Sequence, residues 1–153
     1  MEEQMARHLV AEEGKKLQQA GLVARTWGNI SCRIDENHFV ITPSGLDYEM
    51  MTAVDLVLMD IRNGVCCGVH KPSSEKGVHL AAYQTFPEVG YVIHTHQTYA
   101  TAIGLCGFEQ LAMTEEEAEK LGGIARAAYG LSSTEKLAGA VYDAMQSGAK
   151  VVF

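Results

Sequence analysis

His94 and His96 are the residues whose types and spacing most clearly point to chemistry. They follow the short apolar run Tyr91-Val92-Ile93, which predicts a strand. Because side chains two residues apart on a strand lie on the same face, both imidazoles can reach one ion. Neutral imidazoles are typical zinc ligands, and a catalytic zinc site usually has three protein ligands. Taken alone, the pair more often indicates two hydrogen-bonded histidines in a core than a metal site.

A carboxylate precedes these histidines, in the stretch Pro72-Ser73-Ser74-Glu75. Proline and serine predict a loop that leads into a helix, with a serine as the cap and Glu75 in the first turn. Taken alone, Glu75 is an ordinary first-turn carboxylate stabilised by the helix dipole. Beside two imidazoles, it predicts a metal site with an acid/base attached. His79 lies four residues later on the same helix face, where it either supports this site or simply packs.

The elements that position these residues follow from the spacing of apolar residues and from turn signals. Gly21 is expected to end the first helix, and Arg62-Asn63-Gly64 to form a hairpin turn. Thr114 and Ser132 each begin the pattern S/T-x-x-E of a capping box. The expected helices lie at 3–20, 78–86, 98–105, 115–127 and 133–146, and the expected strands at 31–34, 38–41, 55–60, 65–69, 91–93 and from 150 onward.

Composition excludes several classes of protein. The chain has 153 residues, of which 47% are hydrophobic, so it can form one domain with a real core. Its net charge of -7 argues against binding to a nucleic acid backbone. No signal sequence or apolar run predicts secretion or a membrane span. The four cysteines (Cys32, Cys66, Cys67 and Cys106) have no CxxC spacing, which favours reduced, mostly buried thiols in a cytoplasmic protein.

Four short motifs in a fixed order resemble those of the class II aldolase/adducin family. They are Gly28-Asn29-Ile30-Ser31, Thr42-Pro43-Ser44-Gly45, Pro72-Ser73-Ser74-Glu75 and His94-Thr95-His96. The resemblance continues through Tyr83 to Tyr129 and the helix that begins near Thr134, and it covers essentially the whole chain.

The resemblance implies an α/β fold in which a three-layer α/β/α arrangement surrounds a central, mainly antiparallel sheet. It implies a single domain over residues 1–153 that often assembles into homotetramers with sites between subunits. Family members also carry a third zinc-binding histidine in an N-H-G or H-H-G stretch after a late strand. Because no histidine follows His96, we expect a C-terminally incomplete domain, or a remaining ligand from water or a neighbouring chain.

The resemblance also implies a set of roles for the site residues. His94 and His96 would hold one zinc ion per chain, and Glu75 would be the catalytic acid/base and a further metal ligand. A carboxylate in a low-dielectric pocket can move a proton at carbon when its pKa is raised. The residues that would bind the substrate phosphate are Gly28, Asn29, Ser44, Gly45, Ser73 and Ser74.

The implied activity is that of a zinc-dependent aldolase of the fuculose-1-phosphate type. It would cleave a ketose 1-phosphate to dihydroxyacetone phosphate and an aldehyde through a metal-stabilised enediolate. Two other enzymes share these motifs, a pentulose-5-phosphate 4-epimerase and a thio-sugar phosphate dehydratase. A non-catalytic, adducin-like interaction domain is the alternative from another class. The expected partner is a small phosphorylated sugar, with no nucleic acid and no membrane.

Overall fold

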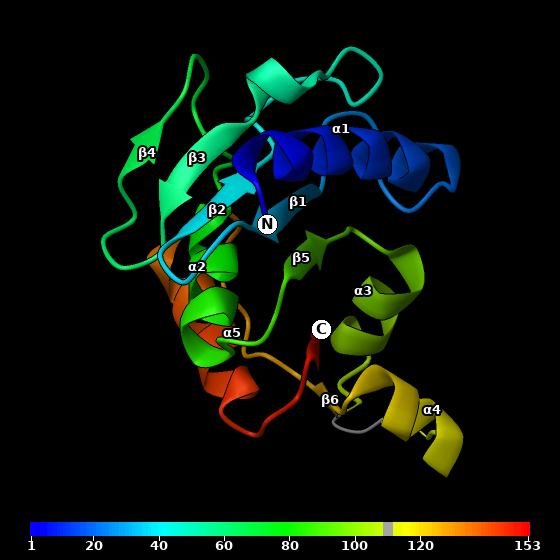
Figure 1. The fold of residues 1–153 in the computed structure, drawn as a ribbon. Coiled ribbons are helices and arrows are strands. Elements are labelled where there is room, and N and C mark those ends of the chain that lie inside the picture. The colour runs from blue at the N-terminus through cyan, green and yellow to red at the C-terminus, as the bar shows by residue number, and fades with distance from the viewer. Residues whose placement is uncertain (109–111) are drawn as a thin grey trace.

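A five-stranded antiparallel sheet lies at the centre of the computed structural model, which describes residues 1–108 and 112–153 (Figure 1). Its strand order is β4-β3-β2-β1-β5. Consecutive strands from β1 to β4 are neighbours, whereas β5 comes back across the sheet to pair with β1. The strands are β1 (Asn29–Arg33), β2 (His38–Ile41), β3 (Val57–Asp60), β4 (Cys66–Cys67) and β5 (Tyr91–His94).

Helix α1 (Glu3–Gln19) covers one face of this sheet (Figure 1). Its buried face includes Ala6 and Val10, which pack in one cluster with Ile30 and Cys32 of β1 and Val40 of β2. These strand residues alternate with residues on the opposite face, as the period of a strand requires. The predicted helix over 3–20 and the predicted hairpin at Arg62-Asn63-Gly64 are confirmed, and the strands expected at 31–34 and 38–41 pair with each other as β1 and β2.

Helices α2 (Lys76–Thr85) and α5 (Glu135–Met145) form the layer on the other face (Figure 1). Tyr83 of α2 is 1% exposed and packs against Phe39, Ile41 and Met59 of the sheet. Helix α5 lies against α2 through Val141 and Met145. The predicted α/β/α arrangement around a mainly antiparallel sheet is confirmed.

The remaining elements lie beyond the β5 edge of the sheet (Figure 1). Helices α3 (Thr98–Leu105) and α4 (Glu115–Leu121) precede a separate parallel pair, β6 (Ile124–Ala125) and β7 (Val151–Val152). The expected helix over 115–127 was too long, since α4 ends at Leu121. Gly122 and Gly123 both have positive φ, which ends the helix and lets the chain enter β6.

One strand is shorter than predicted, and one short helix was not predicted. The expected strand over 65–69 is reduced to the two residues of β4, and a short 3-10 helix, η1 (Ala53–Asp55), precedes β3. The four cysteines are free, but the expectation that most of them are buried was wrong: only Cys32 is buried, because Cys66 and Cys67 lie on the short edge strand β4 and Cys106 follows the exposed end of α3. Within the described ranges, every helix is too short or too polar to cross a membrane.

Candidate active site

Helix α2, strand β5 and the loop after β5 bring the predicted metal ligands together. Glu75 is the N-cap residue of α2, and His94 is the last residue of β5. His96 lies two residues beyond the end of that strand, so strand alternation alone does not place it. The two imidazole rings are nevertheless stacked, with centroids 4.9 Å apart and planes inclined by 21°.

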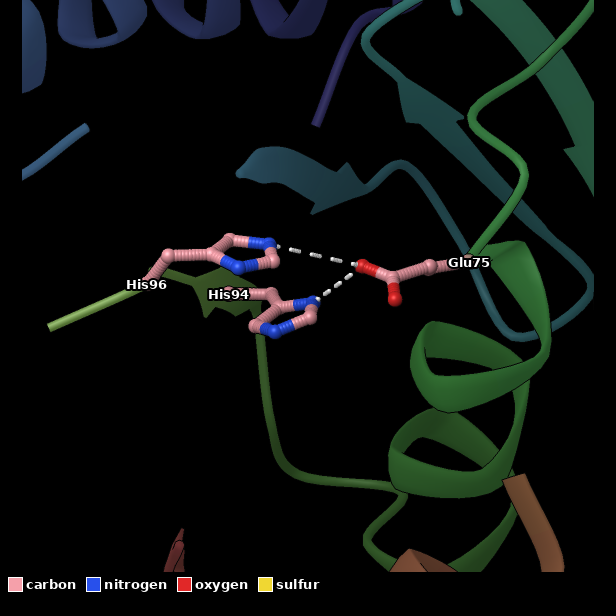
Figure 2. A group of neighbouring side chains, drawn as sticks. All are labelled: Glu75, His94 and His96. Atoms are coloured by element: carbon pink, nitrogen blue, oxygen red, sulfur yellow. Dashed lines mark ion pairs between the residues drawn. The ribbon is translucent and has the colours of Figure 1, made fainter. Parts of the chain in front are cut away.

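Both imidazoles point toward the carboxylate of Glu75 (Figure 2). The Oε2 atom of Glu75 lies 2.8 Å from His94 Nδ1 and 4.0 Å from His96 Nε2. One ligand atom from each residue falls within 4.8 Å of the other two. Such a set of two nitrogens and one oxygen can hold a divalent metal ion.

His94 Nδ1 supports this fit. The atom is buried and makes no hydrogen bond within the described residues. Its 2.8 Å approach to Glu75 Oε2 is thus a close contact without the direction of a hydrogen bond. A buried ring nitrogen without a hydrogen-bond partner can serve as a metal ligand when it carries no proton, so the residues present fit a bound cation.

Glu75 is held as an anion. The imidazole of His94 beside it is the largest influence and, against the opposing effect of burial, lowers the pKa of Glu75 to about 2. Hydrogen bonds from Ser132 and Asn29 act in the same direction. The raised pKa expected of a general acid/base is therefore not found. Burial also lowers the pKa of His96, which favours the neutral ring that binds metals.

The start of α2 differs from the expectation in its capping. Glu75 is not in the first turn but at the N-cap position, and its side chain does not cap the helix. The hydroxyl of Ser73 instead accepts a hydrogen bond from the Glu75 backbone N–H. Because the Glu75 carboxylate does not cap the helix, it can point into the site, where Asn29 and Ser132 donate hydrogen bonds to it.

A polar cleft of about 330 Å³ opens beside these ligands. All six residues predicted to bind phosphate line it: Gly28, Asn29, Ser44, Gly45, Ser73 and Ser74. The other lining residues are Thr26, Trp27, Pro43, His96 and Ser132. No lysine or arginine belongs to this described lining.

Backbone N–H groups are the strongest anion-binding feature of the cleft. Those of Gly28, Gly45 and Ser74 make no hydrogen bond to any other described residue. Backbone N–H groups without a partner, on residues that line one cleft, can hold a phosphate without a basic side chain. The structure thus gathers the six residues predicted to bind phosphate around one cleft, and their role stays a prediction.

Gly28 joins this cleft to the histidine strand. Its φ is +81°, and a Cβ atom there would lie 2.9 Å from the carbonyl oxygen of His94 and 2.6 Å from Val23 Cγ1. Only glycine fits such a close approach in this conformation. The Gly28 loop and the end of the histidine strand are thereby held at a fixed spacing.

Ser132 is a site residue that the sequence analysis misassigned. Its Oγ donates a 2.8 Å hydrogen bond to Glu75 Oε1, and it does not begin a helix. Thr134 is the N-cap of α5 and accepts a hydrogen bond from the Leu137 N–H. The run Ser132-Ser133-Thr134 offers several capping registers, and spacing alone did not distinguish them.

Two other residues were given too little weight. Asn29 lines the cleft but is 4% exposed, and its Nδ2 donates to Glu75 Oε2 at 3.3 Å. Trp27 is 56% exposed, and its ring lies 6.0 Å from that of His96. The only sequence signal for a role of these two residues in the site is that they flank Gly28.

Comparison with known proteins places this arrangement in a family. Residues 8–153 match the model of the class II aldolase and adducin N-terminal domain. A solved L-fuculose 1-phosphate aldolase is 34% identical, with a TM-score of 0.83 over 92% of this chain and 67% of that one.

Two further structures share the fold at lower identity. YgbL from Escherichia coli is 23% identical, with a TM-score of 0.83 over 92% of this chain and 70% of its own. The L-fuculose-1-phosphate aldolase of Thermus thermophilus is also 23% identical, with a TM-score of 0.73 over 93% of this chain and 71% of its own. The chain belongs to the class II aldolase/adducin family.

Proposed function

We propose that the chain is a zinc-dependent sugar-phosphate aldolase that cleaves a ketose 1-phosphate of the fuculose-1-phosphate type. The observation that carries this proposal is the opening of a Glu-His-His metal site onto a cleft with unpaired backbone N–H groups. The 34% identical relative, an L-fuculose 1-phosphate aldolase, supports the same substrate class. The products would be dihydroxyacetone phosphate and an aldehyde.

In this proposal the substrate phosphate binds at the cleft formed by the Gly28, Ser44 and Ser73 loops. Backbone N–H groups of Gly28, Gly45 and Ser74 donate to the phosphate oxygens, and serine hydroxyls add further hydrogen bonds. His96 lines the same cleft, so the sugar end of the substrate faces the histidines. This orientation directs the reacting carbons toward Glu75.

Glu75 would handle the proton at carbon. A divalent ion held by His94 and His96, with or without Glu75, supplies Lewis-acid stabilisation of the negative charge that develops on the substrate. In the direction of addition, the anionic carboxylate accepts a proton from the hydroxymethyl carbon of dihydroxyacetone phosphate. That carbon then forms the bond to the aldehyde carbon, while the aldehyde oxygen takes up the proton, directly from Glu75 or through water, and becomes a hydroxyl. In cleavage that hydroxyl gives its proton back to Glu75 by the same route, and the carboxyl group then delivers it to the carbon.

Ser132 and Asn29 would keep the carboxylate oriented during this exchange. Each donates one hydrogen bond to a different oxygen of Glu75. The charged carboxylate is favoured by both bonds, so it rests as a base ready to accept a proton.

The direct test is turnover of a panel of ketose 1-phosphates and pentulose 5-phosphates by the zinc-loaded protein. Release of dihydroxyacetone phosphate, followed by its coupled reduction, is expected from a ketose 1-phosphate. The Glu75→Gln variant should keep the site volume but lose about 10²–10⁴-fold in rate.

The epimerase, dehydratase and non-catalytic alternatives predict different results with the same panel of sugar phosphates. Interconversion of pentulose 5-phosphates without carbon–carbon cleavage would replace the aldolase proposal with an epimerase, and loss of water would indicate a dehydratase. No turnover of any sugar phosphate by metal-loaded protein would favour a non-catalytic, adducin-like domain.

We also propose that the chain acts as a cytoplasmic homotetramer, as its family membership supports. Light scattering at several concentrations measures the mass of the assembly. A monomer over the whole range would contradict this part of the proposal.

A further inference from the structure

A line of buried hydrogen bonds runs between β1 and α2 and ends at the carboxylate of the candidate metal site. From its far end to the carboxylate, it passes through Tyr83, Ser31, His79, Asn29 and Glu75. Tyr83 OH and Ser31 Oγ are 2.8 Å apart, and Ser31 Oγ and His79 Nδ1 are 2.6 Å apart. His79 Nε2 meets Asn29 Oδ1, and Asn29 Nδ2 meets Glu75 Oε2 at 3.3 Å. Every member is at most 6% exposed.

Two elements alternate along this line. Strand β1 supplies Asn29 and Ser31, which are two residues apart and face α2. Helix α2 begins at Glu75 and supplies His79 and Tyr83, at successive intervals of four residues. A period of two on the strand and of four on the helix lets the two rows interleave. His79 sits at the middle, between the two strand residues.

The charge of Glu75 fixes the direction of every bond in the line. A carboxylate only accepts, so the Asn29 amide presents its N–H₂ group to Glu75 and its oxygen to His79. That oxygen also only accepts, so His79 Nε2 must carry the proton. Full burial lowers the pKa of His79 to about 3, so the ring is neutral and its Nδ1 accepts from Ser31. Ser31 in turn accepts from Tyr83.

We propose that His79 is a positioning residue for Glu75: as the neutral Nε2–H tautomer, it locks the Asn29 amide so that its N–H₂ group holds the metal-binding carboxylate. Without the donor of His79, the buried amide oxygen of Asn29 has no partner, and the amide is held only by its bond to Glu75. The Asn29 side chain can then shift, and the carboxylate loses the fixed N–H₂ group that holds it beside His94.

This inference deepens the proposed function, since it rests on Glu75 being a working ligand and base. It also limits the role expected for Asn29 in phosphate binding. The amide oxygen and one N–H of Asn29 are already used within the line, so only one N–H remains for a substrate.

Metal affinity in two His79 variants tests the role. His79→Gln keeps a donor and an acceptor at the same depth, whereas His79→Leu fills the space with neither. Titration of the apoprotein with Co²⁺, followed by its absorption spectrum, should show affinity about 10–100-fold weaker in His79→Leu. His79→Gln should restore most of that loss.

Val10→Ala is the control for a loss of stability alone. Val10 is 1% exposed and packs on the opposite face of the sheet, away from the line. Its substitution should lower the free energy of unfolding and leave the Co²⁺ affinity unchanged. Equal affinities in His79→Leu and the wild type, or an equal loss in Val10→Ala, would overturn the positioning role.

The tautomer gives a second readout that needs neither metal nor activity. In the protein labelled with ¹⁵N at its six histidines, the resonances lost in His79→Gln belong to His79. Long-range ¹H–¹⁵N spectra should show a neutral ring with the proton on Nε2 at pH 7. A proton on Nδ1, or a charged ring, would contradict the proposed line.

These results are separable from the fate of the aldolase proposal. The tautomer and the Co²⁺ affinity can behave as expected while no ketose 1-phosphate is cleaved, and then only the proposed reaction fails. If cleavage occurs but His79→Leu binds Co²⁺ like the wild type, only the positioning role fails.

Discussion

At the scale of single residues, Glu75 determines what the site can do. It is buried next to two imidazoles, yet it remains an anion because hydrogen bonds and the His94 ring outweigh its desolvation. A buried carboxylate with this balance suits a metal ligand that is also a proton acceptor. It does not suit a proton donor in the resting protein.

This balance makes stability depend on pH in the metal-free protein. The pKa of Glu75 falls from 4.5 to about 2 on folding, so the carboxylate stabilises the fold above pH 4.5. That stabilisation, about 3 kcal/mol at most, should be lost as the pH falls from 4.5 toward 2. Urea unfolding in the presence of a chelator, at several pH values, measures it.

Glu75→Gln is the matched comparison, since glutamine has the same shape and does not titrate. Other carboxylates titrate in both proteins, so the difference between their unfolding free energies isolates Glu75. We expect this difference to shrink as the pH falls through the stated window. Parallel curves would mean that Glu75 is not stabilised as an anion.

The sequence identified the ligands better than it identified their supports. Glu75, His94 and His96 were found from residue type, spacing and family motifs, and the structure brings them together. The contacts of Asn29 and Ser132 with Glu75 depend on side-chain directions across 46 and 57 residues of sequence. No local pattern carries that information.

At the scale of elements, Gly28 is the junction between β1 and the end of β5. Gly28→Ala should lower the free energy of unfolding by about 2–4 kcal/mol, from positive φ and from contact with the His94 carbonyl. Gly45→Ala is the control, because its φ is +75° and nothing lies within 4 Å of an added Cβ. It should cost only about 1–2 kcal/mol. Equal losses by urea unfolding would contradict the contact with His94.

Two neighbouring hydroxyl residues before α5 have different roles: Thr134 caps the helix, whereas Ser132 donates a hydrogen bond to Glu75. Thr134→Ala should lower the unfolding free energy by about 1 kcal/mol, because it removes the acceptor for the Leu137 N–H. Ser132→Ala should leave that free energy nearly unchanged but raise the pKa of Glu75, because a bond to the charged form is lost. Carbon NMR of the Glu75 carboxyl group measures the second effect. If Ser132→Ala destabilises the helix and Thr134→Ala does not, the capping assignment is reversed.

The predicted element boundaries were wrong where glycine residues end a helix or where a short strand pairs with a distant segment. The helix predicted over 115–127 stops at Leu121 because Gly122 and Gly123 adopt positive φ. The pair of β6 with β7 joins residues 27 positions apart, Ile124 and Val151. The spacing of apolar residues predicts that a helix forms, but it does not show that the residues after Leu121 will instead pair with a distant strand.

At the scale of the whole molecule, the candidate metal site connects two layers. Glu75 begins α2 in one helical layer, and His94 ends β5, which lies at the edge of the described sheet. Tyr91 and Ile93 of β5 are about half exposed, so one face of this strand has little cover among the described residues. An ion bound by both elements would tie the edge strand to the helices.

Zinc should therefore stabilise the fold as a whole, and β5 in particular. We expect about one zinc ion per chain after dialysis, and a gain of about 2.7 kcal/mol in unfolding free energy at 100 times the dissociation constant. Amide hydrogen exchange in β5 should slow by the same free energy, because local opening of the strand would then require release of the ion. The double variant His94→Ala/His96→Ala should show neither effect. Equal stabilisation of that variant would place the zinc elsewhere, whereas global stabilisation without added protection of β5 would mean that the ion does not hold the strand to α2.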